Sequence, residues 1–65
     1  MTDAERLDWL ERNHTLHQSV EIIYVVDGYE VQIVDEDGFT NLSPAFHGAD
    51  LRSAIDSAIA ERGKG

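Results

Sequence analysis

Two runs of β-branched and aromatic residues, 20–26 and 29–34, are separated only by the dipeptide Asp27-Gly28. Asp-Gly between two such runs is among the strongest short-range signals of a β-hairpin, because a type I′ turn needs positive φ at both central residues. A two-residue loop at this dipeptide also predicts the strand register: Val26 opposite Tyr29, Tyr24 opposite Val31, and Ile22 opposite Ile33.

The period of two along a strand divides this hairpin into two different faces. The first face is almost wholly apolar and consists of Val20, Ile22, Tyr24, Val26, Tyr29, Val31 and Ile33. The second face is mixed and consists of Glu21, Ile23, Val25, Glu30, Gln32 and Val34. We expect the first face to form the core and the second to remain open to solvent or to a partner.

A helix is predicted at each end of the chain. Thr2 followed three residues later by Glu5 matches a capping box, so the first helix should begin at about Asp3, and its narrow apolar stripe, Leu7 and Leu10, should face the core. The segment Asn13-His14-Thr15 should end it. The second helix should begin after an N-cap at Asp50 and end near a C′ glycine at Gly63. Its apolar positions have helical spacing: Leu51, Ala54, Ile55, Ala58 and Ile59.

Between the hairpin and the second helix, Asp35-Glu36-Asp37-Gly38 predicts a turn, residues 39–42 a short third strand, and residues 43–48 a loop. The expected fold is therefore α+β: an N-terminal helix, an antiparallel β-hairpin or three-stranded meander, and a C-terminal helix, with both helices on one sheet face. Residues 1–65 should form a single compact domain.

Charge restricts the kinds of partner. Thirteen Asp and Glu against five Lys and Arg give a formal net charge of −8. Such a field repels nucleic acid and anionic membranes and attracts basic surfaces. The longest apolar run, residues 22–26, is too short to span a membrane, and no basic region precedes an apolar stretch at the start. Together with the absence of cysteine, this predicts a cytoplasmic protein, without a secretory leader, that binds neither membranes nor nucleic acid directly.

The positions of the acidic residues suggest a binding surface. Same-face residues on a strand lie about 6.6 Å apart, close to twice the axial spacing of about 3.4 Å between phosphates on one DNA strand. A rigid array of carboxylates could therefore compete with DNA for a basic groove. The predicted partner-binding residues are Glu5, Asp8, Glu11, Glu21, Glu30, Asp35, Glu36 and Asp37.

An apolar contact is the alternative to the acidic one. Trp9 lies roughly 100° away from the Leu7 and Leu10 stripe, where it covers the edge of the core or anchors an interface. On the mixed sheet face, Ile23, Val25 and Val34 form an apolar strip. The same face could join two copies, so a monomer or a weak homodimer is expected.

Three motifs suggest chemistry but fit it poorly. His14-x-x-His17 lacks a third metal ligand nearby, and Asp35-Glu36-Asp37-Gly38 lacks the spacing and terminal Glu of an EF-hand loop. Asp56-Ser57 is similar to the phosphopantetheine site of carrier proteins but lies within a predicted helix instead of at its start. We therefore expect no metal, no cofactor and no enzymatic activity.

As a whole, the chain resembles the small anti-CRISPR proteins encoded by phages and mobile elements, in particular inhibitors of type I systems. The resemblance is one of size, charge and layout, and it covers the opening helix (residues 2–10), the Asp27-Gly28 hairpin and the closing helix (residues 50–56). It implies that the protein binds a CRISPR effector stoichiometrically and that this binding blocks the binding of target DNA. These inhibitors share no common signature, so no site residue is carried over. The alternative is a small phage or bacterial adaptor, or an antitoxin-like protein, that binds a single protein partner.

Overall fold

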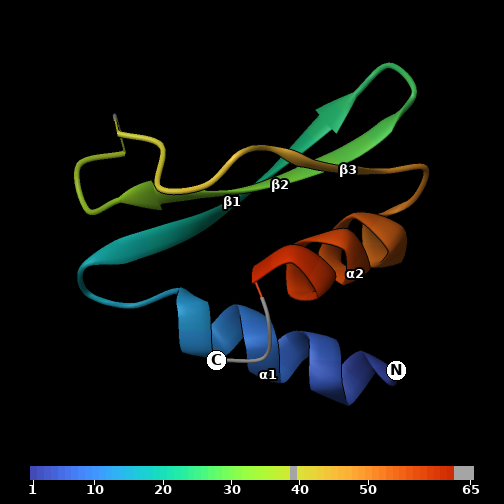
Figure 1. Ribbon diagram of the computed structural model, residues 1–65, viewed down its shortest axis with the longest axis horizontal. Coiled ribbons are helices and arrows are strands. Elements are labelled where there is room, and N and C mark those ends of the chain that lie inside the picture. Colours follow the sequence, from blue (N-terminus) through green and yellow to red (C-terminus); the bar gives the residue numbers. More distant parts are fainter. Residues whose placement is uncertain (39, 63–65) are drawn as a thin grey trace.

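A computed structural model describes residues 1–38 and 40–62 as a helical layer packed on one face of a sheet (Figure 1). The three strands are antiparallel in the order β1-β2-β3. The elements in chain order are α1 (Asp3–Asn13), β1 (Gln18–Val25), β2 (Gly28–Asp35), β3 (Phe46–Gly48) and α2 (Leu51–Arg62). The predicted α+β class and the placement of both helices on one sheet face are confirmed.

Helix α1 begins with the predicted capping box. The Thr2 Oγ1 accepts the Glu5 N–H at 3.2 Å, and the Glu5 Oε1 accepts the Thr2 N–H at 3.0 Å. The helix ends at Asn13, whose side-chain amide donates to the Trp9 carbonyl at 2.8 Å. Both predicted ends of this helix are confirmed.

The predicted buried stripe of α1 is wrong. Trp9 is only 1% exposed and belongs to the core, whereas Leu7 is 65% exposed and Leu10 is half-buried. Trp9 shares its helix face with Arg6 and Asn13, which are three and four residues away. One indole has far more apolar surface to bury than a leucine, so its burial sets the rotation of α1.

The hairpin forms, but its register is shifted by two residues from the predicted one. Val25 pairs with Gly28, so the two-residue turn is Val26-Asp27. Neither turn residue has positive φ, which excludes the predicted type I′ geometry. A Cβ on Gly28 would clash with the Gly48 carbonyl, so this glycine permits a close backbone approach. Because the shift is even, the strand residues keep their predicted faces. Of the face expected to form the core, Val31 and Ile33 are buried, but Ile22, Tyr24 and the turn residue Val26 are exposed.

The third strand lies later in the chain than predicted, at Phe46–Gly48, within the segment expected to be a loop. Asn41 forms only an isolated bridge with Val34, and Phe39 lies outside the described residues. Beside this bridge, the Leu42 N–H donates to the Ile33 carbonyl at 2.7 Å. Phe46 is 7% exposed and enters the core, and this burial favours its short strand over the earlier segment.

The core lies between the sheet and the helices. Its buried members are Trp9, Val31, Ile33, Phe46, Ala54, Ile55, Ala58 and Ile59. Helix α2 has the predicted N-cap, since the Asp50 carboxylate accepts the Ser53 N–H at 2.8 Å. Its predicted apolar stripe is buried apart from Leu51, which is 38% exposed. Gly63, the predicted C′ residue, lies outside the described residues.

Trp9→Ala should be far more damaging than Leu7→Ala. Removing a buried indole typically costs about 3–5 kcal/mol, close to the whole stability of a domain this small. The exposed Leu7 should cost about 0.5 kcal/mol or less. Urea unfolding followed by circular dichroism at 222 nm measures both changes. Equal losses would contradict the orientation of α1 described above.

Gly48→Ala should also destabilise the fold. A Cβ at Gly48 would overlap the backbone of Ser53 and Ala54, where β3 passes α2. Overpacking of this kind costs typically about 1–3 kcal/mol. Thermal unfolding should show a clear drop in Tm. An unchanged Tm would mean that β3 does not lie this close to α2.

Candidate interaction surfaces

The two layers of the molecule carry different charges. All four described cations, Arg6, Arg12, Arg52 and Arg62, lie on the helices. Residues 14–49, which include all three strands, contain no Lys or Arg. The same segment contains six acidic residues: Glu21, Asp27, Glu30, Asp35, Glu36 and Asp37. The sheet layer, meaning residues 14–49, is therefore acidic without any permanent positive charge.

On the sheet face away from the helices, two glutamates stand close together. Glu21 pairs with Gln32, and Glu30 lies two residues before Gln32 on the same strand. Glu21 and Glu30 are thus diagonal neighbours on one face, with a spacing of about 7–8 Å typical of such positions. Neither forms an ion pair with a described residue. The structure therefore brings these two predicted site residues together.

The turn after β2 carries three more predicted site residues, which have different roles. The Asp35 carboxylate accepts the Asp37 N–H at 3.1 Å and the Thr40 N–H at 3.3 Å, so it holds the turn together. Glu36 lies 3.4 Å from His17, and Asp37 is exposed. Glu36 and Asp37 are available to a partner, whereas Asp35 has a structural role.

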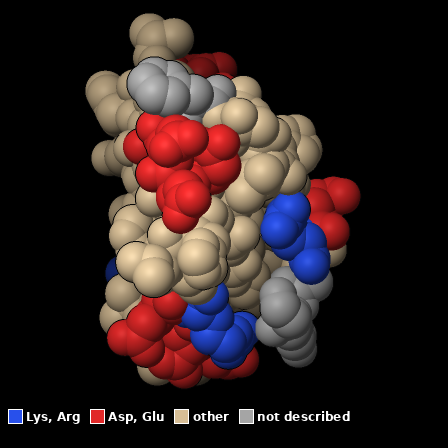
Figure 2. All heavy atoms as spheres, turned by 90° about the vertical axis from the view of Figure 1, so that its left-hand side faces the viewer, with Lys and Arg blue, Asp and Glu red and all other residues tan. Residues whose placement is uncertain are grey.

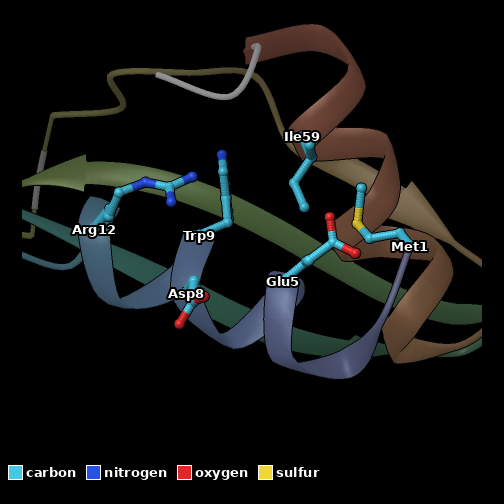
Figure 3. A pocket seen from close by; sticks show the side chains of 6 residues that line it. All are labelled: Met1, Glu5, Asp8, Trp9, Arg12 and Ile59. Carbon is cyan, nitrogen blue, oxygen red and sulfur yellow. The ribbon is translucent and has the colours of Figure 1, made fainter.

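The three predicted site residues of α1 lie in the other layer. Glu5 belongs to the capping box, while Asp8 and Glu11 are exposed. Figure 3 shows Glu5 and Trp9 directed toward Ile59 of α2 and Asp8 directed away from them. Together with Met1 and Arg12, these four side chains line an open hollow of about 210 Å³. The α1 carboxylates thus lie on the helix side of the sheet, whereas Glu21 and Glu30 lie on its other face.

Seen from one end, the acidic residues form separate patches instead of one continuous surface (Figure 2). Uncharged surface lies between the patches. The large red patch just below the upper grey atoms has no blue atoms beside it, whereas the red patches at the right and at the bottom have blue atoms next to them. The acidic surface predicted from the sequence therefore divides into an unneutralised part and a part mixed with cations.

Ion pairs between the helices place further cations beside carboxylates. Arg6 binds both carboxylate oxygens of Asp56, at 2.8 and 2.9 Å, and also Asp3 at 2.7 Å. Arg52 binds both carboxylate oxygens of Asp3, at 2.8 and 3.0 Å. The hydrogen bond from Arg52, helped by Arg6, lowers the pKa of Asp3 to about 2. Arg6 lowers the pKa of Asp56 in the same way.

The histidines have separate partners. His14 Nδ1 accepts the Val20 N–H at 3.3 Å, His17 lies beside Glu36, and His47 Nε2 lies 3.3 Å from Asp27. Within residues 1–38 and 40–62, no three His, Cys, Asp or Glu side chains gather as metal ligands. His14 and His17 are thus engaged by different parts of the chain.

Two of the four predicted apolar contacts are buried. Trp9 is 1% exposed and Val34 is 2% exposed, so neither side chain reaches the surface of the folded chain. Val34 lies where residues 40–43 run back along β2, a packing that the period-two pattern did not reveal. Ile23 is 40% exposed and Val25 is half-buried, so only these two remain of the strip.

The sequence interpretation missed an apolar groove on the helix side of β1. Leu7, Leu10 and Ile22 line two adjoining hollows, one of about 300 Å³ that also includes Leu51. Leu7 is 65% exposed and Ile22 is 46% exposed. The sequence did show Leu7 and Leu10 as an apolar stripe on the first helix, but this stripe was predicted to face the core.

No protein-family model, curated protein or solved structure matches the chain. Among the helices of the described residues, neither has the length and apolar character needed to cross a membrane. Function is therefore inferred from the surfaces described above.

Acid should weaken the contribution of Asp3 to stability. Its folded pKa of about 2 lies below the ordinary value of 3.8, so its stabilising effect is complete above about pH 4 and is lost as the pH falls toward 2. Asp3→Asn should therefore lower the urea midpoint at pH 6, and most of this difference should vanish at about pH 2. Asp8→Asn, which removes a carboxylate without an ion pair among the described residues, is the control. A difference for Asp3→Asn that persists unchanged at low pH contradicts the ion-pair assignment.

Proposed function

We propose that this protein is a non-catalytic inhibitor that binds a basic, DNA-accepting surface of a type I CRISPR effector and blocks the binding of target DNA. The observation that carries the proposal is the charge of the sheet layer, where six acidic residues stand without a Lys or Arg between residues 14 and 49. The likeness to anti-CRISPR proteins in size, charge and layout identifies the effector as the first partner to test. Its place of action is then the bacterial cytosol.

The sheet gives these carboxylates a fixed arrangement. Glu21 and Glu30 are held on paired strands, and the neighbouring turn is fixed by the hydrogen bonds of Asp35. Because these backbone positions are already ordered, this protein loses little conformational entropy when it binds a partner. A set of Lys and Arg residues that normally hold phosphates is the complementary surface.

The carboxylates of the helix layer are less suited to this role. Asp3 and Asp56 are already occupied by Arg6 and Arg52. Of the eight predicted residues, Glu5 belongs to the capping box, Asp35 holds the turn, and Asp8 and Glu11 share α1 with Arg6 and Arg12, which reduce the local field. The proposed contact is therefore made by Glu21, Glu30, Glu36 and Asp37. This narrows the eight acidic residues predicted from the sequence to four.

The alternative, an adaptor or antitoxin-like protein that binds one partner through an apolar strip on the same face, receives less support. Val34 is buried, and the strip is reduced to Ile23 and Val25. This remnant is small compared with the buried apolar centre of a standard interface.

Two variants with equal net charge test the position of the contact. The sheet variant combines Glu21→Gln, Glu30→Gln and Asp37→Asn, and the helix variant combines Asp8→Asn, Glu11→Gln and Glu61→Gln. Each removes three negative charges and changes the formal charge from −8 to −5. Competition with labelled target DNA for a purified type I surveillance complex measures their potency. At about 0.5 kcal/mol for each exposed pair, the sheet variant should be about tenfold weaker, while the helix variant should remain close to the wild type.

Salt provides a second measurement in the same assay. Inhibition by the wild type should weaken steeply between about 50 and 200 mM salt, because the contact is electrostatic. Salt-insensitive inhibition, or equal losses in the two variants, would contradict DNA mimicry by the sheet layer. Failure of the wild type to displace DNA from the complexes tested would contradict the inhibitor function itself.

A further inference from the structure

Strand β1 lies at an open edge of the sheet. The strand order is β1-β2-β3, so β1 pairs with β2 on one side only. The turn Val26-Asp27 makes Val25 and Gly28 a hydrogen-bonded pair. From there, non-hydrogen-bonded and hydrogen-bonded pairs alternate along the two strands. The backbone groups of Gln18, Val20, Ile22 and Tyr24 must therefore point away from β2.

Two contacts confirm this direction and cover the beginning of the edge. The Val20 N–H donates to His14 at 3.3 Å, and the Gln18 carbonyl accepts the Thr15 N–H at 2.9 Å. No described residue has a hydrogen bond to the outward-pointing backbone groups of Ile22 or Tyr24. Natural proteins usually protect such an edge with Pro, Lys or a bulge, yet β1 contains neither of these residues and pairs without interruption.

The open edge adjoins the apolar groove. Ile22 lies on the helix-facing side of β1 and lines the groove with Leu7, Leu10 and Leu51. On the same side of the strand, Tyr24 is 75% exposed. Its ring packs edge-on against Tyr29, with the ring centroids 5.2 Å apart. Unpaired backbone and exposed apolar side chains thus occur at one place.

Charge at this place is balanced, in contrast to the rest of the molecule. The two hollows of the groove are bordered by two carboxylates, Asp3 and Glu11, and by two guanidinium groups, Arg6 and Arg52. Ion pairs join Asp3 to both arginines. The only charged residue of β1 is Glu21, which lies on the opposite sheet face. Two chains of net charge −8 can therefore approach here with less repulsion than elsewhere.

We propose that two copies of this chain associate through antiparallel pairing of β1 with β1, which joins their three-stranded sheets and covers the Leu7, Leu10 and Ile22 groove. The occupant is a second copy and not a basic peptide, because the groove border is neutral and the strand pattern is self-complementary. This dimer does not depend on the proposed inhibitor function.

Symmetry selects the register. In a twofold dimer whose axis is perpendicular to the sheet, opposed residues must lie on the same face, so their numbers sum to an even value. Centring the pair on Ile23 places Ile22 opposite the partner's Tyr24, so that only the free backbone groups of the edge are paired, and it places Glu21 opposite the partner's Val25. Centring on Glu21 would instead oppose two carboxylates, which is destabilising. A standard interface buries about 800 Å² on each partner, roughly a fifth of the 4294 Å² surface of one chain.

Sedimentation equilibrium from about 5 to about 500 µM tests the association. The wild type should approach twice the monomer mass of 7.3 kDa as concentration rises. Ile22→Lys should remain monomeric, because it places a charge within the interface. Leu42→Lys should dimerise like the wild type, since Leu42 is similarly exposed at 44% but lies next to β2 instead of on β1. Near-ultraviolet circular dichroism of Trp9 verifies that both variants are folded.

Hydrogen exchange by NMR then tests the mode of pairing. The amides of Ile22 and Tyr24 should become protected at high concentration in the wild type and stay unprotected in Ile22→Lys. Added salt should strengthen the dimer by screening the two negative chains, opposite to its effect on binding a basic partner. A monomer at every concentration, a dimer of Ile22→Lys, or unchanged exchange at these two amides would each overturn the proposal.

Discussion

The burial of Trp9 is the interaction on which the rest of the structure depends. Its indole is 1% exposed and packs in the core that α2 and the sheet also form. This orientation turns Arg6 toward Asp56 of α2 and turns Leu7 outward. One packing contact therefore determines the ion pairs between the helices and the apolar groove beside β1.

The ion pairs in turn determine how charge is distributed. Because Arg6 and Arg52 bind Asp3 and Asp56, the interhelical side is close to neutral. The sheet layer has no corresponding cations, so its carboxylates set the field that a partner encounters. The acidity of the chain is thus a property of one layer more than of the whole molecule, and the neutral side is left for apolar association.

Local patterns predicted the elements well, because capping, alternation and helical spacing act within a few residues. The capping box of Thr2 and Glu5, the N-cap at Asp50 and the alternation of the paired strand residues were confirmed. Properties that depend on distant contacts were not predictable in this way. Gly28 is required by the approach of Gly48 and not by a type I′ turn, so the register was wrong by two residues.

The same distinction applies to the candidate site. The alternation of the strands placed Glu21 and Glu30 on one face correctly, but it could not show that residues 40–43 run beside Val34. The rotation of α1 depends on whether the indole of Trp9 or the side chains of Leu7 and Leu10 are buried. The stripe of Leu7 and Leu10 favoured the leucines, and the prediction was therefore wrong. The groove and the open edge of β1 followed only once the packing of Trp9 was known.

Carboxylate footprinting tests the central claim, that the sheet layer makes the contact with the partner, most directly. Carbodiimide-coupled labelling of Asp and Glu, read by mass spectrometry, compares the free protein with the protein bound to a type I surveillance complex. We expect Glu21, Glu30 and Asp37 to lose most of their labelling in the complex, while Asp8, Glu11 and Glu61 keep theirs. Protection of the helix carboxylates with continued labelling of Glu21 and Glu30 would contradict the claim.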